Sequence, residues 1–209
     1  MTTKISRLYD TYPLAENAVH GLEAAGLSSG DISIIASNAD GWYKKNDKFN
    51  HVDIKHNKDH DGVDDRVKGA QTGAGVGAAA GGAAGVLAGL GLLAIPGIGP
   101  VVAAGWAAST VAGLVAGGAA GSAVGALAES GVNKDDADVI AEAIRRGAAL
   151  VVARVPDADA ARYQAVLDRS SIDVARRGAA YRSAGWTRFD EKSPPYTADD
   201  VRKDRALYS

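Results

Sequence analysis

Residues 51–65 are the first candidate for metal chemistry, because three of the four histidines lie there among acidic side chains. Part of this segment matches the first half of an EF-hand loop, in which alternating oxygen ligands surround Ca²⁺: Asn57, Asp59, Asp61 and Gly62. The twelfth loop position is Lys68 instead of a bidentate glutamate, and no helical pattern precedes the loop. We therefore interpret the segment as a polar loop without a metal or cofactor, and keep a divalent ion as the alternative.

The glycines of residues 73–77 are spaced like the start of a dinucleotide-binding loop, but the context does not fit. No strand leads directly into them, and glycines continue for many further turns. No Walker lysine follows, and the sequence has no Gly-x-Ser-x-Gly elbow and no cysteine. The sequence therefore predicts no catalytic residue, no bound small molecule and no enzyme. The net charge of −2 also argues against nucleic acid as a partner.

One stretch of 60 residues, from Gly69 to Ala128, carries no charge and contains 17 glycines and 20 alanines. Many of its glycines recur every fourth residue, which places them on one face of an α-helix and lets a second helix approach closely. The segment 95–100 contains two prolines and two glycines, which indicates a chain reversal. We therefore predict a helical hairpin with arms 69–95 and 101–128. Its predicted interaction residues are Gly69, Gly73, Gly77, Gly81, Gly85, Gly89, Gly113, Gly117, Gly121, Gly125, Pro96 and Pro100.

Most large apolar side chains of this stretch lie in residues 86–115, near the predicted tip. A two-span hairpin, a re-entrant hairpin and a hairpin buried inside a soluble oligomer all fit this pattern. A lone monomer would expose a large apolar patch to water, so the stretch is expected to mediate association. The N-terminus shows no secretory signal. We therefore expect the cytoplasmic face of the inner membrane, or a cytoplasmic assembly.

The charged flanks alternate between strand and helix patterns. Strands are predicted at 3–9, 31–37, 150–155 and 172–176. Helices are predicted before Gly26, between Asn133 and Gly147, and after a cap at Asp157. This order predicts an α+β protein, a ferredoxin-like βαβ-(inserted helical hairpin)-α-βαβ sandwich. The expected parts are 1–68, the hairpin 69–128, the second half of the sheet domain at 129–178, and a C-terminal tail at 179–209.

The sequence also resembles a known family. The residues that carry the resemblance are LAGLGLLAIPGIGP at 87–100, Gly131-Val132, an acidic helix ending in Arg146-Gly147, and Gly26-Leu27 before Asp31-Ile32. In these features it resembles the bacterial heat-induced general-stress (YflT-like) domain proteins over about residues 3–155. The resemblance implies a stress-associated bacterial protein, of a group often predicted to be membrane-associated, without a catalytic motif to carry over.

The tail holds five of the chain's twelve aromatic residues within residues 181–209, which is too aromatic for a typical disordered tail. Trp186, Phe189 and Tyr196 are its predicted docking residues, and Thr197 is expected to cap a helix over 198–208. The pattern does not decide whether the tail docks on its own domain or on a neighbouring subunit.

Two functions fit the sequence. The favoured one is a non-enzymatic, membrane-associated stress or structural protein that forms homo-oligomers through the glycine-zipper hairpin. The alternative is a sensor that binds a small ligand or a divalent ion and responds by changing its oligomeric state. Pore formation is a weaker third possibility, because few polar residues are present to line a channel.

Overall fold

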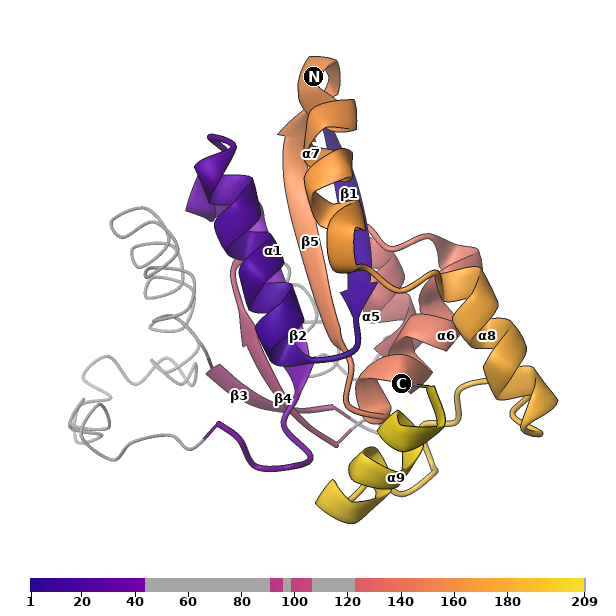
Figure 1. Ribbon diagram of the computed structural model, residues 1–209. Helices are drawn as coiled ribbons and strands as arrows, with labels where there is room; N and C mark the ends of the chain where they lie inside the picture. Colours follow the sequence, from indigo (N-terminus) through magenta and orange to yellow (C-terminus); the bar gives the residue numbers. More distant parts are fainter. Residues whose placement is uncertain (44–90, 96–98, 107–122, 209) are drawn as a thin grey trace, which may run out of the picture.

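The computed structural model describes residues 1–43, 91–95, 99–106 and 123–208 of the 209-residue chain (Figure 1). The strands within these residues are β1 (Thr2–Tyr9), β2 (Ile32–Ser37), β3 (Gly91–Ile95), β4 (Gly99–Ala104) and β5 (Ala149–Pro156). The helices are α1 (Tyr12–Ala24), α5 (Ala123–Glu129), α6 (Lys134–Arg145), α7 (Ala160–Leu167), α8 (Val174–Ser183) and α9 (Ala198–Tyr208). The predicted class, a mixed α+β protein, is confirmed.

The five strands form one sheet in the order β1-β5-β2-β4-β3, and every neighbouring pair is antiparallel. Strand β5 lies between β1 and β2, so β1 and β2 run parallel to one another although they are not adjacent. Ile32 pairs with Ala153, which in turn pairs with Ile5. The N-terminal β-α-β unit therefore wraps around a strand that comes more than a hundred residues later in the chain.

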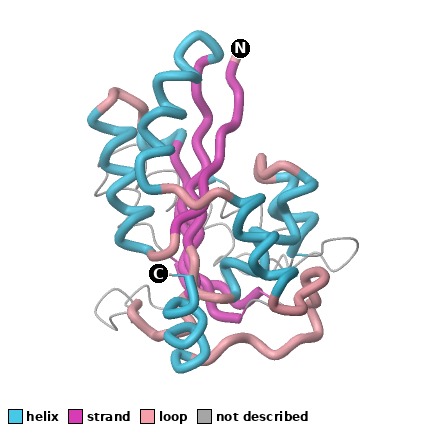
Figure 2. Tube along the Cα trace, turned by 45° about the vertical axis from the view of Figure 1, so that its right-hand side comes forward, coloured by secondary structure: helices cyan, strands magenta, loops and turns pink. Residues whose placement is uncertain are grey.

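Helices cover both faces of the sheet, and the ferredoxin-like arrangement predicted from the sequence is not confirmed (Figure 2). Ile32 and Ile34 of β2 pack with α1 and α7, whereas Ile35 packs with α5 and α6 on the opposite face. Strand β5 alternates in the same way, because successive side chains of a strand point to opposite faces. Both faces of the central strands are apolar, so both must be covered. The described residues therefore form three layers, with α6 opposite α1 and α7.

The helical hairpin is wrong for residues 91–95 and 99–104, which are strands β3 and β4. They pair with each other in antiparallel register, and β4 also pairs with the edge of β2. Ile95 and Gly99 each precede a proline, a position biased toward extended backbone, and Val101 and Val102 are β-branched. These local preferences and the open edge of β2 favour strands over the predicted helices. The chain reversal itself falls where it was predicted.

Gly105 ends β4 at a position that only glycine fits. Its φ is +86°, and a Cβ built there would lie 2.4 Å from the carbonyl oxygen of Ile32 and 2.5 Å from Oγ of Ser33. The backbone of β4 therefore leaves the sheet in close contact with β2. The predicted second helical arm, 101–128, is therefore wrong at Gly105 as well.

Most helix ends follow the predicted local signals. Asn133 caps α6 by accepting a hydrogen bond from the backbone N–H of Asp135 at 3.1 Å, and Gly147 follows the helix with a φ of +104°. Thr197 caps α9 over the predicted residues 198–208, accepting a bond from Asp200 N at 3.3 Å. Asp157 does not cap α7 directly, because a 3₁₀ turn precedes that helix.

The predicted strand at 172–176 is wrong apart from one residue. Ile172 forms a single antiparallel bridge with Leu8, and α8 begins two residues later at Val174. The helix starts there because the side chain of Asp173 accepts a hydrogen bond from the backbone N–H of Arg176 at 2.9 Å. The outer edge of β1 is therefore paired at Leu8 and has no further partner strand among the described residues.

Candidate functional site

The predicted interaction residues of the uncharged stretch are mostly outside the described residues. Gly125 lies in α5, and Pro100 lies in β4, paired with Ala94. Those outside are Gly69, Gly73, Gly77, Gly81, Gly85, Gly89, Pro96, Gly113, Gly117 and Gly121. In the described part of the chain, no helix has both the length and the hydropathy needed to cross a bilayer.

The aromatic residues of the tail pack on their own domain. Phe189 is buried in the core cluster formed by α5, α6 and one face of the sheet, and its backbone N–H donates to Oδ1 of Asp138 at 3.2 Å. Trp186 is half-buried against the same cluster and meets the ring of Tyr181 edge-on, with 5.9 Å between centroids. The described tail thus docks within its own chain, one of the two arrangements left open by the sequence.

Tyr196 docks through two arginines at the end of α6. The guanidinium carbon of Arg145 lies 5.1 Å from the centre of the Tyr196 ring, and that of Arg146 lies 5.5 Å from it. Arg146 also lies over the ring of Tyr181, at 4.2 Å. The planar cation is therefore held between an aromatic ring of α8 and one of the tail, an arrangement that guanidinium groups favour.

A group of buried ion pairs surrounds this cation, and we name it the Glu142 cluster: Glu142, Arg145, Arg146 and Asp204. Oε1 of Glu142 accepts hydrogen bonds from Arg145 Nη2 at 2.7 Å and from Arg146 Nε at 2.6 Å. Arg146 Nη1 reaches Oδ1 of Asp204, in α9, at 2.7 Å. The side chain of Glu142 is completely buried and that of Asp204 is 9% exposed. The cluster therefore ties the last helix to α6 through charges that are almost completely removed from water.

Charge and burial act against each other in the Glu142 cluster. Burial lowers the pKa of Arg146, but hydrogen bonding to Glu142 and the nearby carboxylates raise it further, so the net shift is upward and the cation is retained. Burial raises the pKa of Asp204, and the attraction of Arg146 offsets only part of that shift. All the ion pairs of the cluster must therefore form together, because a buried charge without its partner would lower the stability of the fold.

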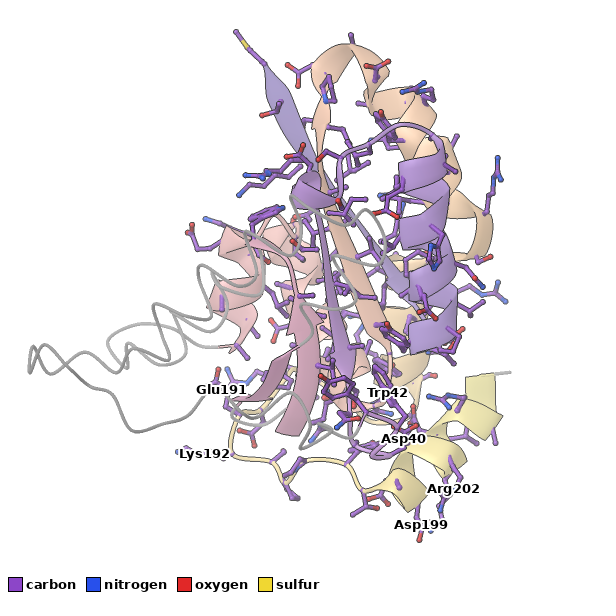
Figure 3. All side chains as sticks on the ribbon, turned by 90° about the vertical axis from the view of Figure 1, so that its left-hand side faces the viewer. Asp40, Trp42, Glu191, Lys192, Asp199 and Arg202 are labelled. Atoms are coloured by element: carbon purple, nitrogen blue, oxygen red, sulfur yellow. The ribbon has the colours of Figure 1, made fainter. Side chains whose placement is uncertain are left out.

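The tail also reaches the root of the uncharged stretch. Oε1 of Glu191 accepts a hydrogen bond from the backbone N–H of Ala123, the first described residue of α5, at 2.6 Å. Figure 3 shows Glu191 on the loop that leads to α9. A carboxylate is favourable at a helix N-terminus, where N–H groups have no partner within the helix. The tail thus contacts α5 at its first described residue, Ala123.

Tyr181 gives the site a pH dependence that can be measured. Burial raises the pKa of its phenol to about 12, and the hydrogen bond with Arg177 lowers it less. Between pH 10 and 12 the unfolded chain has lost this proton and the folded chain keeps it, so stability falls as pH rises. We expect the Tyr181→Phe variant to show a shallower fall in the free energy of unfolding, measured by urea unfolding at several alkaline pH values. Parallel curves for the two proteins would contradict this assignment. Some slope remains in the variant in either case, because burial also raises the pKa values of Tyr9 and Tyr12.

The Glu142 cluster was not predicted from the sequence. The signal was present as the spacing of Glu142 and Arg146, four residues apart on one helix face. Such pairs usually lie on the solvated face of a helix, so their burial depends on the tail that covers them. Asp204 is 58 residues from Arg146 in the chain, and no local pattern connects the two.

No metal site is found in the part of the chain that the structure describes, where no three histidine, cysteine or carboxylate side chains gather closely enough to hold an ion. The candidate loop at 51–65 lies outside those residues.

Comparison with known proteins gives no match: no family model, no curated protein and no solved structure is similar to this chain. The resemblance to the YflT-like general-stress proteins therefore remains an expectation from the residues quoted above.

Proposed function

We propose that this chain is a non-enzymatic, self-associating scaffold protein, in which a three-layer domain holds the uncharged stretch and presents it to further copies of the chain. The observation that carries the proposal is the pairing of Gly91 with Ala103, at the two outer ends of the β3–β4 hairpin. Gly91 follows the segment 69–90 in the chain, and the described residues that begin with β4 end at Trp106, just before the segment 107–122. We take the paired strands as the common support of the two glycine-rich segments.

Both ends of the second segment are attached to the domain. Gly105 lies against β2, and Ala123 is bound by Glu191 of the tail. A domain that holds one end of the segment 69–90 and both ends of the segment 107–122 lowers the conformational entropy that is lost when those segments associate. Close packing of glycine faces is the interaction that a four-residue spacing favours. We therefore assign self-association to the segments 69–90 and 107–122.

Membrane association is a weaker part of the proposal. Val101 and Val102, predicted to lie near the tip of the hairpin, are fully buried inside the domain. Fewer large apolar side chains of the stretch are thus left for a bilayer than the sequence suggested. Flotation of the protein with phospholipid vesicles measures what remains. The sensor alternative keeps a small ligand or a divalent ion, and its candidate ion loop at 51–65 lies outside the described residues.

Leucine substitutions test the assignment. We expect the variant Gly77→Leu, Gly81→Leu, Gly117→Leu and Gly121→Leu to elute from gel filtration as a smaller particle than the wild type, because four large side chains separate the glycine faces. A control variant adds three leucines in the same segments, two residues out of phase with the glycines: Ala79→Leu, Ala83→Leu and Ala119→Leu. Equal particle sizes of the glycine variant and the wild type would overturn the proposal, provided that circular dichroism shows both folded.

A further inference from the structure

The outer edge of β1 lines a groove that the proposed scaffold function does not use. The groove has a volume of about 680 Å³, and α6 borders it on one side while α7 and the start of α8 border it on the other. Apolar contacts come from Ile140, Ile172 and Val174. Pockets of this size hold peptides and small molecules.

The backbone of β1 in this groove is an unfinished sheet edge. The N–H of Ile172 donates to the carbonyl oxygen of Leu8 at 2.7 Å, so the peptide groups of Leu8 point outward. Along an antiparallel strand, successive residues direct their peptide groups alternately to one side of the strand and to the other. The peptide groups of Lys4 and Ser6 therefore point outward, like those of Leu8. No described strand pairs with them, although the guanidinium of Arg7 bonds to the carbonyl oxygen of Ser6 at 2.8 Å. An extended chain is the ligand that such an edge fits.

The charges around the groove select the side chains of that ligand. Both cations are already engaged, because Arg7 Nε lies 2.5 Å from Oδ1 of Asp168 and Lys4 Nζ donates to the carbonyl oxygen of Glu129 at 3.1 Å. Asp136, on α6, is half-buried, and its carboxylate has no hydrogen-bond or ion-pair partner among the described residues. A cationic side chain on the bound strand would supply that partner.

We propose that this groove binds an extended segment of a partner protein, which adds a strand to the edge of β1 and places a lysine or arginine against Asp136. The added strand lies beside residues 2–6, because Ile172 already occupies the edge at Leu8. Main-chain hydrogen bonds to Lys4 and Ser6 provide affinity, and Asp136 provides selectivity for a basic residue.

Fluorescence anisotropy of the full chain with labelled peptides tests this proposal. The first probe is a six-residue peptide of alternating valine and threonine with one central arginine. A second peptide has glutamate in place of the arginine, and a third has every backbone nitrogen methylated. We expect saturable binding of the arginine peptide, binding of the glutamate peptide weaker by about fivefold or more, and none of the methylated peptide.

Two protein variants locate the site. Asp136→Asn should weaken binding of the arginine peptide about fivefold, while Asp199→Asn, on the exposed face of α9, should leave it unchanged (Figure 3). Equal affinity for all three peptides, no effect of Asp136→Asn, or no binding of the arginine peptide would each overturn the proposal. A fall in peptide binding as the concentration of the chain itself rises would also overturn the proposal, because a second copy of the chain would then occupy the groove.

Discussion

The Arg146→Met variant is expected to lose about 3 to 5 kcal/mol of its free energy of unfolding, measured by urea denaturation at neutral pH. Methionine keeps most of the volume of the side chain but removes its charge. Asp204 then loses its ion-pair partner at 2.7 Å while remaining almost fully buried, and Glu142 keeps only its bond to Arg145. An uncompensated buried carboxylate is one of the few single changes that cost this much.

The matched control is Arg202→Met on α9. Arg202 also pairs with an aspartate, Asp199, but both side chains are more than half exposed and project from the outer surface of the helix (Figure 3). Its loss should cost less than about 1 kcal/mol, as for most surface pairs. The double variant Arg146→Met with Asp204→Leu should recover much of the loss, because no unpaired charge is left at that position. Equal stability of Arg146→Met and Arg202→Met would show that the Glu142 cluster is solvated.

The Gly105→Ala variant is expected to lose about 2 to 5 kcal/mol, again as free energy of unfolding. Two costs combine at this position. An alanine at a φ of +86° is strained, and its Cβ would lie 2.4 Å from the carbonyl oxygen of Ile32, a backbone atom that cannot move without shifting β2. The strand β4 should therefore loosen from the sheet. Faster hydrogen exchange of the β4 amides is the second observable.

Gly185→Ala separates the two costs. Gly185 has a similar φ of +90°, but nothing lies within 4 Å of the Cβ that alanine would add there. Only the backbone strain remains, which is about 1 to 2 kcal/mol. If Gly105→Ala costs no more than Gly185→Ala, then β4 does not leave the sheet in contact with β2, and the anchoring of the uncharged stretch is contradicted.

Elements with strong local signals were predictable from the sequence. The α6 cap at Asn133, the glycine that follows it and the Thr197 cap of α9 depend on side chains within three or four residues of the helix end. The first two strands and β5 were found because runs of β-branched and apolar residues are bounded by turn signals. Their order in the sheet follows from contacts between distant residues and was not predicted in full.

The errors have a common physical cause, which is that tertiary partners decide between local alternatives. Residues 91–95 and 101–104 lie in the arms of the predicted helical hairpin, yet the open edge of β2 stabilises β4, and through it β3, as strands. Ile172 begins a strand pattern, yet the cap at Asp173 starts a helix. The tail docks on its own domain because Phe189 is buried in the core and Asp204 pairs with Arg146. Both residues are distant in the chain from α6. A sequence pattern shows which residues are present, but it does not show which distant residues they contact in the fold.

The molar mass of the full chain, measured by sedimentation equilibrium without detergent over a wide range of concentrations, tests the proposed scaffold function most directly. One chain has a mass of 21.3 kDa. The proposal predicts a multiple of this mass for the wild type and for the control variant, in which leucines replace Ala79, Ala83 and Ala119. It predicts a lower mass, approaching 21.3 kDa, for the variant with leucines at the repeat glycines. A wild-type mass of 21.3 kDa at every concentration would contradict self-association through the uncharged stretch.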